Sequence, residues 1–84
     1  MNIQEIEKIQ TELLGKLWNA NQSGIYQILQ DNYNQNKRET EYDREQIHKL
    51  IAINQYIENV LESIDSGDFN EDLWDEESRE DKGD

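Results

Sequence analysis

The 84-residue chain contains no cysteine. This absence excludes disulfides, thiolate metal ligands and cysteine nucleophiles, and it is compatible with a reducing compartment. The first residues, 1–7, lack the basic start and apolar run of a signal peptide, so we expect the protein in the cytoplasm. The longest wholly apolar run, residues 50–53, is far shorter than the roughly 20 residues that cross a bilayer, so we expect no membrane span.

The chain is also poor in the residue patterns that catalysis requires. His48 is the only histidine, and no serine, cysteine or carboxylate offers it the nucleophile and orienting group of a catalytic triad. The four glycines are scattered, so no glycine-rich phosphate loop is present. We therefore predict a protein that is not an enzyme and that uses no cofactor.

One segment resembles a calcium-binding loop in part. Asp68, Asn70 and Asp72 match the first three ligand positions of an EF-hand. Leu73, however, takes the turn position that requires glycine, and Arg79 replaces the bidentate glutamate at the twelfth position. Both departures are disabling, so we predict no specific metal site.

Basic residues are few, with 8 Lys and Arg against 20 Asp and Glu, which gives a net charge of −12. Such a charge repels nucleic acid backbones and anionic lipid surfaces, so direct binding to either is disfavoured. The expected partner is instead a basic protein, and one that itself binds nucleic acid fits this charge best.

The apolar residues predict an all-α protein, a small bundle of about three helices. They recur at steps of three and four in residues 3–19, 24–35 and 41–66, which are the three helices that we expect. Asn2 and Thr40 are the expected N-caps of the first and third helices, and Gly67 is the expected stop. The polar run from Asn19 to Gly24 favours a break between the first two.

Apolar residues are scarce after Gly67. Of the 19 Leu, Ile, Val and Phe residues, 17 lie at or before Ile64. Residues 68–84 hold nine acidic and two basic side chains, and this density of like charge disfavours a compact state. We therefore predict a folded domain over residues 1–67 and a mobile, largely disordered acidic tail over residues 68–84.

The third expected helix contains a regular apolar register, which we call the apolar seam. Asn54 lies where a coiled-coil seam would carry Ile or Val, and a buried Asn there can fix register and oligomeric state. A homodimer is one interpretation; the other places Asn54 at the edge of a wide face, hydrogen-bonded to water or backbone. The seam consists of Ile47, Leu50, Asn54, Ile57, Leu61 and Ile64.

Acidic side chains on the third helix and in the tail are the candidate partner-binding residues. Three of them, the acidic stripe Glu58, Glu62 and Asp65, follow at helical spacing. Within the tail, the i, i+4, i+5 spacing of Phe69, Leu73 and Trp74 would place them on one side of a short helix if a partner or the body supplied an apolar surface. The tail candidates are Asp68, Phe69, Glu71, Asp72, Leu73, Trp74, Asp75, Glu76 and Glu77.

These features support three hypotheses about function. The leading one is an inhibitor or modulator that mimics DNA and occupies a basic, nucleic-acid-binding surface. Small, acidic, cysteine-free phage proteins act in this way on host defence or repair enzymes, a CRISPR nuclease being one such target, although no family motif is present. The alternative is a dimerising helical adaptor whose acidic, aromatic tail docks in a partner's groove. The third is a structural helical protein with a solubilising tail.

Overall fold

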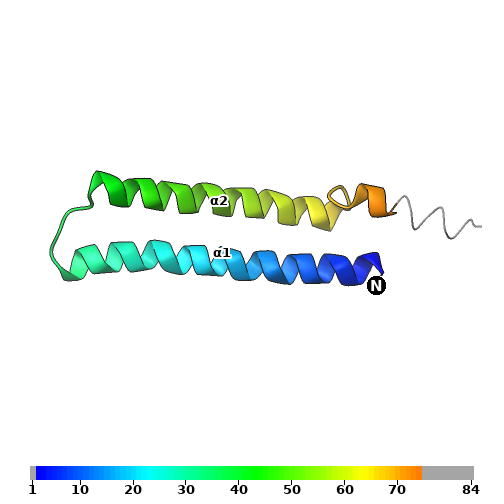
Figure 1. Ribbon diagram of the computed structural model, residues 1–84, viewed down its shortest axis with the longest axis horizontal. Helices are drawn as coiled ribbons and strands as arrows, with labels where there is room; N and C mark the ends of the chain where they lie inside the picture. The colour runs from blue at the N-terminus through cyan, green and yellow to red at the C-terminus, as the bar shows by residue number, and fades with distance from the viewer. Residues whose placement is uncertain (1, 75–84) are drawn as a thin grey trace, which may run out of the picture.

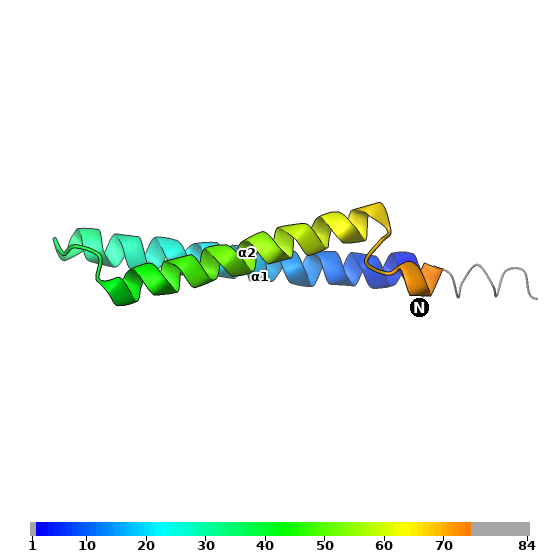
Figure 2. The same ribbon diagram turned by 90° about the horizontal axis from the view of Figure 1, so that it is seen from above.

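A computed structural model describes residues 2–74 and shows an antiparallel helical hairpin (Figure 1). Helix α1 spans Ile3–Asn34 and helix α2 spans Glu41–Ser66. The two helices lie side by side and cross at a shallow angle (Figure 2). The described part of the chain is all-helical and contains no strand, so the predicted fold class is confirmed at this level.

The expected break between residues 19 and 24 was wrong, because α1 is one continuous helix of 32 residues. Two polar side chains in this segment bond to α2 and not to their own backbone. Asn21 Nδ2 donates to Asn54 Oδ1 across 2.9 Å, and Gln22 Oε1 accepts from Asn54 Nδ2 across 3.3 Å. The protein is therefore a two-helix hairpin where we expected three helices.

Both ends of α1 are capped by asparagine. The Asn2 side chain accepts a hydrogen bond from the Glu5 backbone N–H across 2.8 Å, as predicted for an N-cap. At the other end Asn36 takes a left-handed conformation with φ of 54°. Lys37 N–H then donates to Asn32 O, and Asn36 N–H donates to Tyr33 O, the two bonds of a Schellman motif.

Helix α2 has the bounds that the sequence predicted, residues 41–66. Thr40 and Asp43 form a reciprocal capping box, in which each side chain accepts from the other's backbone N–H. Gly67 ends the helix with φ of 89°, a conformation that a residue with a Cβ adopts only under strain. These local signals mark the two ends of α2.

The apolar seam of α2 packs against α1 of the same chain. Asn54, Ile57 and Ile64 are buried, and Leu50 Cδ1 would lie 3.3 Å from a Cβ added at Gly24. Gly24 is therefore a close helix contact, whereas a Cβ at Gly15 would meet nothing within 4 Å.

Asn54 is the polar centre of this interface and is only 3% exposed. Besides its bonds to Asn21 and Gln22, its Nδ2 donates to the Trp18 carbonyl across 3.2 Å. Its burial rules out the edge position that we had considered. The residue is buried as the seam interpretation requires, but the partner helix belongs to the same chain.

The tail begins with an ordered segment. Residues 68–74, which we call the terminal turn, leave α2 at Gly67 and end in a single helical turn that contacts the first half of α1. The prediction of a disordered tail was therefore wrong for these residues. Residues 75–84 of the predicted tail lie outside the described part of the chain.

Replacing the buried amide should destabilise the hairpin. In Asn54→Ala, Asn21 and Gln22 lose their partner in the interface, at an expected cost of about 1–3 kcal/mol in the free energy of unfolding. Urea denaturation followed by circular dichroism measures this loss. The matched control is Asn59→Ala, an exposed asparagine on the same helix, which should change stability by less than about 0.5 kcal/mol. Equal effects of the two substitutions would contradict the role of Asn54.

The loop corner of the hairpin should respond to acid. Asn32 Nδ2 donates to Asp43 Oδ2 across 3.0 Å, and together with the Thr40 backbone N–H it lowers the pKa of this carboxyl from 3.8. A pKa lower in the folded than in the unfolded chain contributes stability above about 3.8, and this contribution is lost as pH falls through the lowered value.

Comparison of the wild type with Asp43→Asn isolates this contribution. The difference in unfolding free energy between the two should be largest near neutral pH and should shrink as the pH falls below about 3.8. Urea denaturation at a series of pH values measures it. A difference that stays constant from neutral to strongly acidic pH would show that the Asp43 carboxylate does not stabilise the corner.

Candidate protein-binding site

Acidic side chains from three segments meet at one end of the hairpin. The antiparallel arrangement brings the first half of α1 beside the second half of α2, and the terminal turn folds back onto α1. Residues 2–19 and 54–74 together hold nine acidic and two basic side chains, a net charge of −7. Residues 20–53 hold five acidic and four basic ones, a net charge of −1. We call these two parts the acidic end and the loop end.

The acidic stripe of α2 lies on the surface at the acidic end. Glu58, Glu62 and Asp65 are all exposed, and Glu58 Oε2 accepts a hydrogen bond from Trp18 Nε1 across 3.2 Å. This bond ties the stripe to α1. Glu62 and Asp65 are presented to solvent along the same flank of α2.

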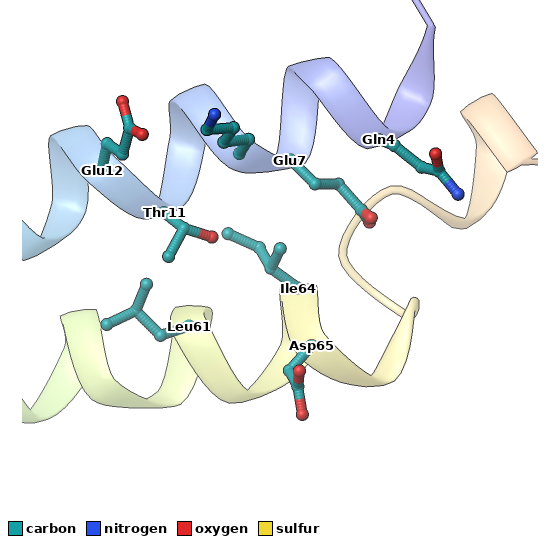
Figure 3. Close-up of a pocket in the computed structure, with 8 residues that line it drawn as sticks. Gln4, Glu7, Thr11, Glu12, Leu61, Ile64 and Asp65 are labelled. Atoms are coloured by element: carbon teal, nitrogen blue, oxygen red, sulfur yellow. The ribbon is translucent and has the colours of Figure 1, made fainter.

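An open depression beside the stripe joins acids of both helices (Figure 3). Leu61, Ile64 and Thr11 lie between the helices, while Glu12 and Asp65 point outward from opposite helices. Lys8 is the single basic residue among those that line it. Among residues 2–74, no group of three or more His, Cys, Asp or Glu is arranged to hold a metal ion.

The terminal turn is held on α1 by a buried asparagine. Asn70 is 6% exposed and forms reciprocal amide bonds with Gln10: Asn70 Nδ2 donates to Gln10 Oε1 across 2.8 Å, and Gln10 Nε2 donates to Asn70 Oδ1 across 3.2 Å. Glu7 Oε2 accepts from both Asn70 Nδ2 and Trp74 Nε1, each across 3.2 Å. Four side chains, two of the terminal turn and two of α1, thus form one hydrogen-bonded network.

The aromatic side chains of the terminal turn lie in different environments. Phe69 lines an apolar groove with Leu13, Leu14, Tyr56 and Val60. Trp74 instead borders a polar hollow near Gly67 and donates its indole N–H to Glu7. We expected Phe69, Leu73 and Trp74 on one side of a short helix. In the structure Phe69 lines the apolar groove, whereas Trp74 makes a polar contact with Glu7.

The structure brings most of the predicted partner-binding residues to one end of the molecule. Sequence reasoning missed the residues that dock the turn, Glu7, Gln10 and Asn70. Asn70 had been considered only as a vestigial calcium ligand, and nothing local indicates a partner 60 residues away. Asp75, Glu76 and Glu77 lie outside the described residues. The predicted residues found at the acidic end are Glu58, Glu62, Asp65, Asp68, Phe69, Glu71, Asp72, Leu73 and Trp74.

Comparison of the chain with protein-family models, with curated proteins and with solved structures gave no match. Within residues 2–74, neither α1 nor α2 contains an apolar stretch long enough to cross a membrane. The argument about function therefore depends on the geometry and charge of the hairpin.

Removing the docking amide should release the terminal turn. In a Trp18→Phe background, where Trp74 is the only tryptophan, Asn70→Ala should shift Trp74 fluorescence to the red and increase its quenching by acrylamide, because the Gln10 and Glu7 contacts lose their buried partner. Asp72→Ala, an exposed position in the same turn, is the matched control and should leave both signals unchanged. Unaltered quenching in the Asn70 variant would show that the turn is held by other contacts.

Proposed function

We propose that this protein is an acidic, non-enzymatic modulator that occupies a basic, nucleic-acid-binding surface of a partner protein in the manner of a DNA mimic. The single observation that supports this function is the collection of nine acids and two bases at one end of a rigid hairpin. Occupation of that surface competes with nucleic acid and would therefore inhibit a partner that processes nucleic acid.

The density of charge at the acidic end is the quantitative support. One stripe on one helix offers a carboxylate about every 6 Å, which is sparse beside duplex DNA with one charge per about 1.7 Å. The acidic end extends along residues 2–19 of α1, about 27 Å at 1.5 Å per residue. Its net charge of −7, spread over both helices and the terminal turn, therefore averages one charge per roughly 4 Å of axis, which approaches the spacing of about 3.4 Å along a single DNA strand.

The docking of the terminal turn contributes to this density. Asp68, Glu71 and Asp72 belong to the turn, and its contacts with Glu7 and Gln10 place them beside the acids of α1 and α2. A freely moving tail would lose conformational entropy on binding, whereas a docked turn has already lost it. The same contacts weigh against the adaptor alternative, because docking of the tail in a partner's groove would require the Trp74 and Asn70 bonds to break.

Charge-neutral variants test this function. The variant Glu58→Gln/Glu62→Gln/Asp65→Asn keeps the size of each side chain and removes three charges from the acidic end. The control Asp31→Asn/Glu41→Gln/Glu45→Gln removes three exposed charges from the loop end. Affinity capture from the native cell or host lysate, with identification by mass, supplies the partner for both.

The captured partner should bind the wild type and DNA in competition. Affinity should fall steeply as salt increases, because long-range attraction between exposed charges is screened. We expect the acidic-end variant to bind at least about tenfold more weakly, a loss of about 1.4 kcal/mol, and the loop-end control to bind within about threefold of the wild type. Equal loss in both variants, simultaneous binding of DNA, or salt-independent affinity would each contradict the proposed function.

A further inference from the structure

A face of the hairpin is apolar and uncovered. It consists of one stripe of apolar side chains on α1, a second on α2 and one side chain of the terminal turn. We call it the apolar face. We propose that a second copy of this chain packs on the apolar face, with its helices antiparallel to those of the first, to form a four-helix bundle. The face comprises Ile9, Leu13, Leu17, Ile53, Tyr56, Val60 and Phe69.

The spacing of these residues places them together. Ile9, Leu13 and Leu17 follow at i, i+4, i+8 on α1, and Ile53, Tyr56 and Val60 follow at i, i+3, i+7 on α2. Leu13, Tyr56 and Val60 line one groove with Phe69, so both stripes border the same side of the hairpin. This surface is distinct from the apolar seam, which is already buried against α1.

These side chains have substantial area left to bury. Leu13 is 56% exposed, Leu17 55%, Tyr56 70% and Phe69 49%. Within the described residues only three apolar side chains, Ile3, Ile57 and Ile64, count as buried. Helices are stable in water mainly through the burial of an apolar face, and two helices alone leave much of it in contact with solvent. A second pair of helices supplies the missing layer.

The last ten residues of the sequence are polar. Residues 75–84 contain no apolar side chain. We therefore seek the apolar occupant in a second molecule, and the charge pattern indicates which.

The charged positions along the stripes of the apolar face are balanced in sign, although the chain carries a net charge of −12. The charged positions in register with the stripes are two acidic and two basic ones: Glu5, Glu12 and Lys16 on α1 and Lys49 on α2. Glu58 lies two residues from both Tyr56 and Val60, about 160° around the helix from Val60, so the acidic stripe points to the opposite flank. Two apolar faces can thus meet without bringing their acidic stripes together, whereas a basic partner would favour the acidic end.

The uneven charge along the hairpin selects the antiparallel arrangement. The acidic end has a net charge of −7 and the loop end −1. Parallel copies would place two strongly acidic ends side by side, while antiparallel copies place each acidic end beside a nearly neutral loop end and lessen the repulsion. In such a dimer the two acidic stripes stay exposed, so this inference does not depend on the proposed function.

The oligomeric state of the full chain tests the proposal. Sedimentation equilibrium should give twice the chain mass of 10.0 kDa for the wild type. Leu13→Gln/Leu17→Gln should weaken the dimer by at least about tenfold, because these side chains would be buried only in the complex. Since both residues are more than half exposed in one hairpin, circular dichroism of the monomeric variant should still show a helical chain.

The matched control is Ile51→Gln, which removes an exposed apolar side chain outside the apolar face. It should change the dimer dissociation constant less than about twofold. A wild-type chain that is monomeric at its highest soluble concentration would overturn the proposal. Equal weakening by the Ile51 and the double leucine substitutions would overturn the assignment of the face.

A distance measurement tests the antiparallel arrangement. The chain has no cysteine, so Tyr33→Cys introduces one spin-label site at an exposed position of α1. Tyr33 lies 16 residues from Leu17, which is about 24 Å along the helix. With Leu17 near the two-fold axis, pulsed electron resonance should find the two labels about 48 Å apart. A separation below half that value would overturn the antiparallel dimer in favour of a parallel one.

Discussion

The amide of Asn54 determines how the two helices meet. It is buried between them and bonds to a side chain, a second side chain and a backbone carbonyl of α1. Amides pair only with partners in reach, so sliding α2 by one turn would leave several buried polar groups without a hydrogen bond. An apolar residue in this position would allow several registers, whereas the amide favours one.

This register also decides which charges become neighbours. It sets the first half of α1 beside the second half of α2, and the Asn70 contacts add the terminal turn. Acids from residues 2–19 and from residues 54–74, which are far apart in the sequence, thereby come together at one end. An electrostatic field of this kind accelerates the encounter with a positively charged protein. The distance over which the field acts increases as the salt concentration falls.

Features fixed by neighbours in the sequence were predictable. The caps at Asn2 and Thr40 and the stop at Gly67 depend on contacts within one turn of helix, and each appears where the pattern indicated, so both bounds of α2 were predicted. The acidic stripe was predictable for the same reason. The break at Asn19 to Gly24 was not, because Asn21 and Gln22 are stabilised in the helix by an amide about 32 residues further along. The docking of Asn70 on Gln10 escaped prediction for this reason too, since sequence periodicity contains no information about contacts across 60 residues.

The hairpin has one practical consequence for its handling. Residue 2 and residue 74 both lie at the acidic end, because the chain returns to its starting point. Any tag fused near either of these residues would crowd the charged surface. The loop over residues 35–40 is exposed and lies at the far end of both helices. It is the position where a fluorophore or an immobilisation handle would leave the charged surface accessible.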